Sequence, residues 1–276
     1  MTATAAPPDA PLDAAAGARA AAALPANWPR RAGFLALAVY TAYAISTLDV
    51  TTDRVLRGLV QGAAFLKRLW PPNFEPSKLQ LMSAGLLESI EIAILATAIG
   101  VMLSLPLGVL AARNLMPGWV AWGARGLIAL CRSFHPVIVA ILFVKAVGFG
   151  ALAGILALIV ASCGFVSKLF AEAIEEMNLQ QVEAVRATGA SFWGVLAFGV
   201  APQVMARFIG FAAYQLDSNL RNSTMVGIVG GGGIGATLFT AYQRFDYDFL
   251  MTILLAIIAI IMLSELASTR VRKLFQ

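Results

Sequence analysis

Apolar residues in this chain are gathered into blocks that polar stretches separate. The blocks cover residues 33–50, 87–111, 127–147, 152–170, 204–216 and 249–267. A helix needs about 20 mainly apolar residues to cross a membrane, and most of the blocks approach that length. The block at 204–216 is shorter and leads into polar residues and glycines. The pattern therefore predicts an all-α, polytopic membrane protein with about six transmembrane helices, of which the fifth is broken.

Two segments near the N-terminus differ from these blocks. Residues 1–32 are rich in Ala and Pro, which predicts a flexible tail ahead of a transmembrane domain over residues 33–276. No cationic stretch precedes a hydrophobic run there, so we do not expect a signal peptide. Residues 51–86 place basic and apolar side chains at helical spacing, which indicates an amphipathic helix in the membrane interface.

The composition agrees with a membrane protein and disfavours an enzyme. Apolar residues make up 59% of the chain and charged residues 13%, whereas soluble domains carry about 25% charged residues. His135 is the only histidine, and Cys131 and Cys163 are the only cysteines. They are too few for a multi-histidine metal site or a disulfide framework. We therefore expect no metal and no cofactor.

Basic residues at the two ends of the apolar region predict the orientation. Arg30 and Arg31 precede the first block, and Arg270, Arg272 and Lys273 follow the last. Basic residues favour the cytoplasmic side, so both termini are expected there, which an even number of spans allows. The polar segment 172–202 then lies in the cytoplasm. The 51–86 loop would be periplasmic although it is basic, which runs against the same rule.

The 172–202 segment carries the most specific motif of the chain. Glu183-Ala184-Val185 is followed by Gly189 and then by Pro202. This spacing resembles the EAA motif of ABC importer permeases, although Val185 stands where Ala is usual. Small residues make one surface of a short helix that Gly189 can end in a left-handed cap, and such a helix can enter a groove on a partner. The alternative is an ordinary solvated loop.

Further stretches resemble the phosphonate-type branch of these permeases, and the likeness covers roughly residues 80–276. They are residues 111–114, 140–144, 172–176, 187–191, 202–203, 219–223 and 230–235. His135-Pro136, where a Pro-Glu pair is common, and Gly231, where Ala is common, depart from the pattern of that branch.

The resemblance implies a fold like that of type I importers, with a cytoplasmic coupling helix. It also implies a permease subunit of an ATP-driven importer for phosphonate or a related phosphorus oxyanion in the bacterial inner membrane. The implied partners are two ATPase subunits, a periplasmic substrate-binding protein and a second permease subunit, identical or different. No nucleic acid is implied. The chain has no P-loop motif, so ATP hydrolysis is expected in the partner subunits and not here.

The same resemblance suggests three groups of site residues. Contact with the ATPases would fall to Glu183, Ala184, Ala187 and Gly189. The translocation pathway would be lined by Asn219, Arg221, Asn222, Ser223 and Thr224. Gate glycines would be Gly230, Gly232, Gly233 and Gly235.

Two alternatives concern these last groups. Asp217 stands four residues before Arg221, so the two side chains could simply form an ion pair within one helix. The glycines also match G-x-G-x-x-G, but no βαβ unit surrounds them and no acidic residue follows at about 20 positions, so dinucleotide binding is not indicated.

Two other classes of protein remain open at this stage. A secondary transporter of a small anion would also have broken membrane helices, but it would usually show internal repeats and buried acidic groups. A membrane-embedded enzyme would need a cluster of His, Cys, Asp or Glu, which the chain does not supply. The presence of a neighbouring ATPase gene would favour the importer.

Overall fold

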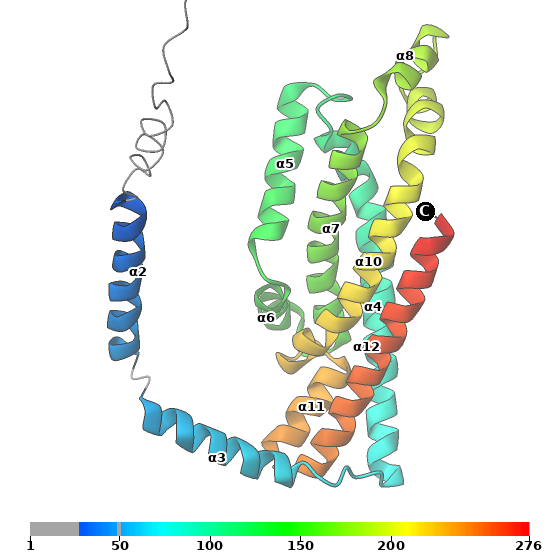
Figure 1. The fold of residues 1–276 in the computed structure, drawn as a ribbon. Helices are drawn as coiled ribbons and strands as arrows, with labels where there is room; N and C mark the ends of the chain where they lie inside the picture. The colour runs from blue at the N-terminus through cyan, green and yellow to red at the C-terminus, as the bar shows by residue number, and fades with distance from the viewer. Residues whose placement is uncertain (1–27, 49–50, 276) are drawn as a thin grey trace, which may run out of the picture. The chain divides into compact units, whose positions relative to one another are not determined.

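The computed structural model describes residues 28–48 and 51–275, and within them all regular structure is helical (Figure 1). The helices are α2 (Trp28–Thr47), α3 (Thr52–Arg68), α4 (Pro76–Ala111), α5 (Gly118–Ser133), α6 (Pro136–Val147), α7 (Ala151–Glu175), α8 (Leu179–Ala187), α9 (Phe192–Gly194), the π-helix η1 (Val195–Val200), α10 (Ala201–Ile228), α11 (Gly233–Gln243) and α12 (Tyr247–Phe275). The prediction of an all-α protein is confirmed.

The chain divides into two compact units, residues 1–64 and 65–276. The first contains α2 and most of α3, and both helices expose apolar side chains along their length. Most of the predicted N-terminal tail lies outside the described residues, but residues 28–32 belong to α2. The sequence places residues 76–86 in an interfacial loop; they instead form the first three turns of α4.

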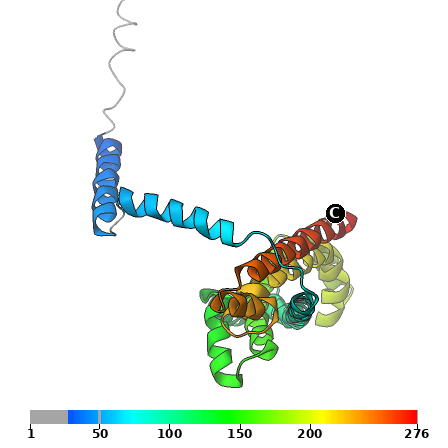
Figure 2. The ribbon, with the colours of Figure 1, turned by 90° about the horizontal axis from the view of Figure 1, so that it is seen from below.

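The second unit is a helical bundle whose centre is formed by α4, α7 and α10 (Figures 1 and 2). Small residues let α4 and α7 approach closely. A Cβ atom added at Gly100 would lie 2.5 Å from Cβ of Ser162, and one added at Gly108 would lie 2.7 Å from the Phe170 ring. Close approach at small residues is a common way for membrane helices to associate, because lipid provides no hydrophobic driving force between them.

Four helical stretches are long and apolar enough to cross a membrane: Pro76–Ala111, Ala151–Glu175, Phe192–Gln243 and Tyr247–Arg270. Two bent pairs, α2 with α3 and α5 with α6, could each add one span, so the described residues offer four to six. The predicted third span is not a straight helix. It bends by 87° where α5 meets α6, because Pro136 cannot continue the preceding helix and instead begins a new one.

The break in the fifth span also differs from the prediction. The polar residues 217–224 do not interrupt α10, which continues to Ile228; the break falls at residues 229–232. The polar side chains remain compatible with a helix because they bond within it. Arg221 pairs with Asp217, and Asn222 donates to Ser218, each across four residues.

Candidate coupling and transport sites

The α8 helix has well-defined ends at the positions that the motif predicts. Asn178 caps its N-terminus, since Oδ1 accepts a hydrogen bond from the backbone N–H of Gln180 at 3.0 Å. Gly189, just beyond its C-terminus, has φ of +79°, the left-handed conformation that favours glycine. Glu183, Ala184, Ala187 and Gly189 are all exposed. The structure thus brings the four residues together on an uncovered helix, and their contact with an ATPase stays a prediction.

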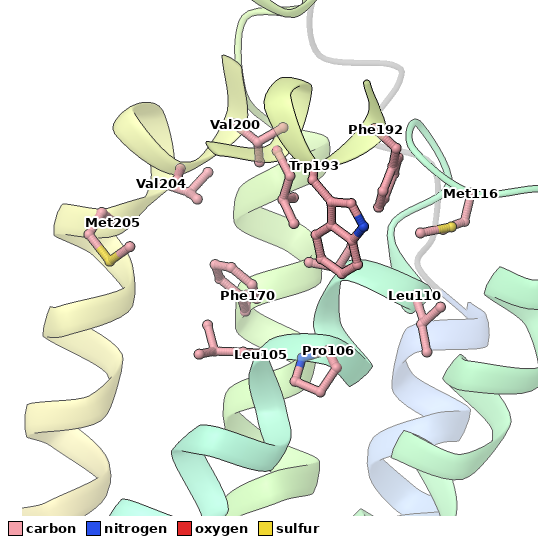
Figure 3. A pocket seen from close by; sticks show the side chains of 13 residues that line it. Leu105, Pro106, Leu110, Met116, Phe170, Phe192, Trp193, Val200, Val204 and Met205 are labelled. Atoms are coloured by element: carbon pink, nitrogen blue, oxygen red, sulfur yellow. The ribbon is translucent and has the colours of Figure 1, made fainter. Parts of the chain in front are cut away.

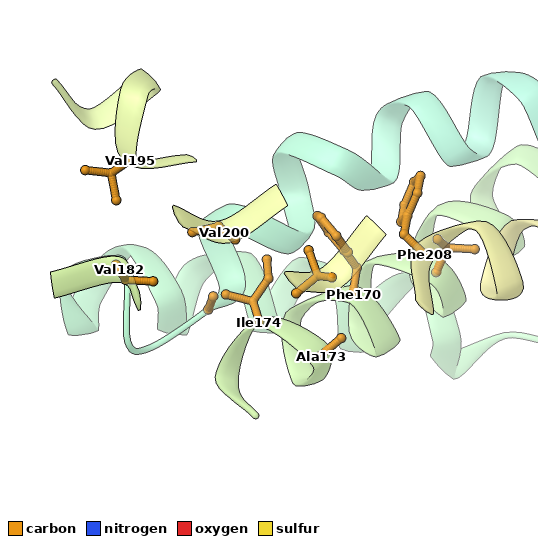
Figure 4. Packing of buried hydrophobic residues seen from close by; sticks show 10 residues of the cluster. Phe170, Ala173, Ile174, Val182, Val195, Val200 and Phe208 are labelled. Atoms are coloured by element: carbon orange, nitrogen blue, oxygen red, sulfur yellow. The ribbon is translucent and has the colours of Figure 1, made fainter. Parts of the chain in front are cut away.

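An apolar core attaches α8 to the bundle (Figure 4). Val182, on the inner face of α8, is only 1% exposed and packs in one cluster with Val195, Val200 and Ile174. Gly199 of η1 lies so close that an added Cβ atom would be 3.3 Å from the Cα atom of Val182. The helix therefore rests directly on the π-helical turn that leads into α10.

Polar contacts join the same two segments, and we name them the Gln203 joint. The backbone N–H of Asn178 donates to Oε1 of Gln203 at 3.0 Å, and Nε2 of Gln203 donates to the backbone oxygens of Asn178 (3.2 Å) and Gly199 (2.7 Å). An ion pair of 2.9 Å between Arg207 and Glu176 lies beside it. These contacts therefore tie the start of α8 to the start of α10. Single π-helical turns are rare and often occur at functional sites.

The predicted pathway residues on α10 do not share one face. Asn219 is fully buried, where Nδ2 donates to Oγ1 of Thr97 (2.9 Å) and Oγ of Ser162 (2.7 Å). Gln215, also buried, donates to Ser162 and to Oδ1 of Asn219. This network ties α10 to α4 and α7 and leaves none of its buried amides unpaired. Gln215 was not among the predicted pathway residues, although it lies one turn before Asn219.

Arg221 lies on the exposed side of α10. Its side chain is 56% exposed and forms the predicted ion pair with Asp217, at 3.2 Å. Asp217 is only 13% exposed, and its other oxygen accepts a hydrogen bond from Ser264 of α12, at 2.5 Å. The carboxylate is therefore fixed between two helices, while the guanidinium points outward with unused donors. Ser223 is buried, and Asn222 and Thr224 are partly buried.

The predicted gate glycines form a tightly packed turn between α10 and α11. Gly230, Gly232 and Gly233 have φ values of +101°, +78° and +73°. Gly235 has an ordinary φ, but an added Cβ atom would lie 2.0 Å from the backbone oxygen of Thr224. Ser89 of α4 caps α11 by accepting a hydrogen bond from Ile234 N–H at 2.8 Å. Glycines occupy these positions because they permit close backbone contact between α10 and α11. The sequence pattern alone did not give this explanation.

A large cavity near α8 is unsuited to an anion. It has a volume of about 550 Å³ and lies between the end of α4 and the start of α10 (Figure 3). Its lining is apolar, and includes Leu105, Phe170 and Trp193. An oxyanion that left water for this cavity would find the indole N–H of Trp193 as its only side-chain hydrogen-bond donor among the lining residues, and burying a charge with so few partners is costly. We therefore exclude this cavity as the substrate site.

Comparisons with known proteins agree with the fold and the motif. Residues 104–276 match the family described as binding-protein-dependent transport system inner membrane component. The phosphite transport system permease protein PtxC of Stutzerimonas stutzeri is 39% identical over 255 residues, which cover 91% of this chain and 91% of that protein. The phosphate-import permease protein PhnE of Mycolicibacterium smegmatis is 40% identical over 206 residues, which cover 74% of this chain and only 38% of that longer protein.

Solved structures of ABC transporters share the fold. A chain of the MetNI methionine ABC transporter, in an inward-facing conformation, has a TM-score of 0.66 and 22% identity, and the match covers 74% of this chain and 100% of that chain. A chain of an amino acid ABC transporter has a TM-score of 0.59, with 71% of this chain covered and 93% of that one. From the family match, the relatives and the shared architecture, we conclude that this chain belongs to the family of binding-protein-dependent transport system inner membrane components, the permease subunits of ABC importers.

Proposed function

We propose that this permease imports phosphonate or a related phosphorus oxyanion across the bacterial inner membrane, together with two ATPase subunits, a periplasmic binding protein and a second permease subunit. The names of the relatives support the substrate class, since PtxC is named for phosphite and PhnE for phosphate. The chain itself supplies the pathway and the surface for the ATPases, and ATP hydrolysis takes place in the partners.

The observation that carries the proposal is the exposed position of Arg221 inside Phe192–Gln243, a helical stretch able to cross a membrane. A lipid-facing Arg near the centre of a helix costs about 2.5–3.5 kcal/mol on insertion scales. The exposed side of α10 is therefore more stable when it faces a second permease subunit than when it faces lipid. A hydrated pathway would then lie between the two subunits. There the guanidinium donors can meet a passing oxyanion, and Asp217 limits the strength of binding so that the anion leaves again.

In this mechanism the buried neighbours of Arg221 hold it in place. Asn219 fixes the rotation of α10 through Thr97 and Ser162, so that Arg221 stays on the opposite, exposed side. Closure of the ATPases would displace α8, and the Gln203 joint would pass that displacement to α10. The packed glycine turn at the far end of α10 would then be the point about which α10 and α11 move together.

Reconstitution tests the substrate class. The permease, its ATPase and its binding protein are placed in vesicles, and ATP hydrolysis and uptake are measured with phosphonates, phosphite, phosphate and sulfate. We expect phosphorus oxyanions to stimulate both activities. Stimulation by sulfate alone, or uptake that needs no ATP, would reject the proposal; the latter result would favour a secondary transporter.

The orientation gives one prediction. In a background without Cys131 and Cys163, a cysteine at Gln180 of α8 should react with a membrane-impermeant thiol reagent only after the inner membrane is opened. A cysteine at Gln243 should react in intact spheroplasts, because Gln243 is the last residue of α11, which lies at the opposite end of the bundle from α8 (Figure 1). Both positions are exposed, so accessibility differs only by side. Labelling of the Gln180 position in intact spheroplasts would reverse the proposed orientation.

The contact with the ATPases gives a second prediction. Gly189→Leu should insert and fold but lose most ATPase-driven uptake, because its left-handed backbone disfavours a branched side chain by about 1–2 kcal/mol and the surface for the partner becomes bulky. No atom lies within 4 Å of an added Cβ atom, so the fold itself has room. Gly189→Asn is the control, since Asn tolerates this conformation. Normal uptake by Gly189→Leu would show that α8 is not the docking helix.

A further inference from the structure

A second group of cations lies away from Arg221, in a groove between α5 and α7. The groove contains a pocket of about 180 Å³, and Arg125, Arg132, Lys168 and Glu172 supply its charged lining. Ala111, Ile128 and Ala171 form its apolar part. Unlike the apolar cavity near α8, this pocket offers several hydrogen-bond donors to a ligand.

The packing of the two helices explains why these cations meet. Arg125 contacts Glu175 at the end of α7, whereas Arg132, two turns further along α5, contacts the middle of α7. A Cβ atom added at Gly164 would lie 2.9 Å from Cγ of Arg132, so Gly164 makes the room for that side chain. The helices are therefore antiparallel. Lys168 stands one turn from Gly164 on the same face of α7, and it lines the same pocket as Arg132.

The carboxylates nearby do not neutralise all of the cations. Arg125 donates to both oxygens of Glu175, at 2.7 Å each, and to the backbone oxygen of Ala111. Lys168 pairs with Glu172 at 3.4 Å, with both side chains nearly half exposed. Within the described residues, the Arg132 side chain has neither a hydrogen bond nor an ion pair. Three cations against two carboxylates leave one positive charge, which is located at Arg132.

The Arg132 side chain meets α7 far from the end of that helix. Gly164 lies eleven residues before Glu175, the end of α7, which is about 16 Å along the helix. Half the hydrocarbon thickness of a bilayer is about 15 Å. If the end of α7 lies at the membrane surface, Arg132 lies near the middle of the bilayer, where an Arg without a counter-ion is costly unless it faces protein, water or an anion. Arg132 is exposed in this chain, so its unpaired guanidinium is available to an anionic ligand.

We propose that the α5–α7 pocket binds a phosphate-type oxyanion through Arg132 and Lys168. The planar guanidinium can hold two oxygens and the ammonium a third. The anion comes either from the transported substrate, which rests on the proposed function, or from the headgroup of an anionic phospholipid, which does not. The pocket is smaller than the roughly 300–1,000 Å³ of drug-sized sites, which suits a single tetrahedral group. Basic pockets between membrane helices are known to hold phosphate headgroups.

The experiment uses the complete importer with Arg132→Gln, Lys168→Gln and both changes together. Arg244→Gln is the matched control, because Arg244 is exposed at the opposite end of the bundle. Each complex is placed in vesicles of phosphatidylcholine, or of phosphatidylcholine with phosphatidylglycerol. Uptake of inorganic phosphate and phosphite is measured in each, and native mass spectrometry counts the phosphatidylglycerol that each complex retains.

Loss of uptake by about tenfold in both kinds of vesicle, with unchanged lipid retention, would assign the pocket to the substrate. Loss of retained phosphatidylglycerol, with lower uptake only in vesicles that contain it, would assign the pocket to a headgroup. Variants that equal the wild-type protein in uptake and in retained lipid would overturn the proposal. If Arg132→Gln does not assemble, Arg132→Lys tests instead whether the pocket binds an anion. It keeps the positive charge and should keep the bound anion.

The two proposals fail separately. A wild-type complex that imports no phosphorus oxyanion would reject the proposed function. The amount of retained phosphatidylglycerol would still show whether the pocket binds a headgroup. A wild-type complex that imports normally, alongside double variants that also do so and retain the same lipid, would reject the pocket alone.

Discussion

Gly235→Ala should leave almost no folded permease, although it adds a single methyl group. The new Cβ atom would lie 2.0 Å from the backbone oxygen of Thr224 and 2.9 Å from the Cα atom of Gly227. Both neighbours are backbone atoms, so no side chain can rotate away, and α10 and α11 would have to separate. The loss should exceed the 1–3 kcal/mol of ordinary overpacking. It is measured as the yield and melting temperature of protein extracted in detergent.

Gly123→Ala is the matched control for this change. Gly123 lies in α5, is exposed, and has no atom within 4 Å of an added Cβ atom. Ala favours a helix by up to about 1 kcal/mol over Gly, so this variant should be at least as stable as the wild-type protein. Equal yields for the two variants would mean that α10 and α11 do not approach as closely as the structure indicates.

Arg221→Gln should assemble at normal levels, keep basal ATP hydrolysis and lose at least tenfold in oxyanion uptake. The side chain is mostly exposed, so its removal disturbs little packing, but the exposed side of α10 loses its cation. Gln still fits a helix and still donates hydrogen bonds, which isolates the effect of charge. Uptake into vesicles and ATP hydrolysis are measured on the same preparation.

Two further variants separate transport from stability. Arg221→Lys should restore part of the uptake, because it returns the charge without the planar donors. If the ion pair is only structural, Arg221→Ala should lower the melting temperature and leave the uptake per assembled complex unchanged. Normal uptake by an assembled Arg221→Gln complex would remove Arg221 from the pathway.

The sequence predicted those features that depend on local chemistry. Apolar length predicted most of the spanning helices, and the spacing of Glu183, Gly189 and Pro202 identified the segment that forms α8. The left-handed backbone of Gly189 follows from the same local rule. These predictions succeed because helix length, caps and turns are decided within a few residues of the chain.

Features that depend on tertiary contacts were not predictable in this way. Nothing in the pattern distinguishes Asn219, which is buried by Thr97 and Ser162, from Arg221 two residues later, because the partners lie on other helices. Gly235 likewise appears free until α10 is placed against it. Pro136 could have indicated the bend between α5 and α6, but hydropathy alone does not predict a change in the direction of a helix.

The Gln203 joint has a consequence for how such permeases can vary between species. The side chain of Gln203 binds peptide groups of residues 178 and 199, and no other side chain. Position 178 is therefore free to change among residues that cap a helix, such as Ser, Thr or Asp, without weakening the link. Position 203 has no such freedom, because only an amide of that length both donates and accepts there. We expect evolutionary substitution to be frequent at position 178 and nearly absent at position 203.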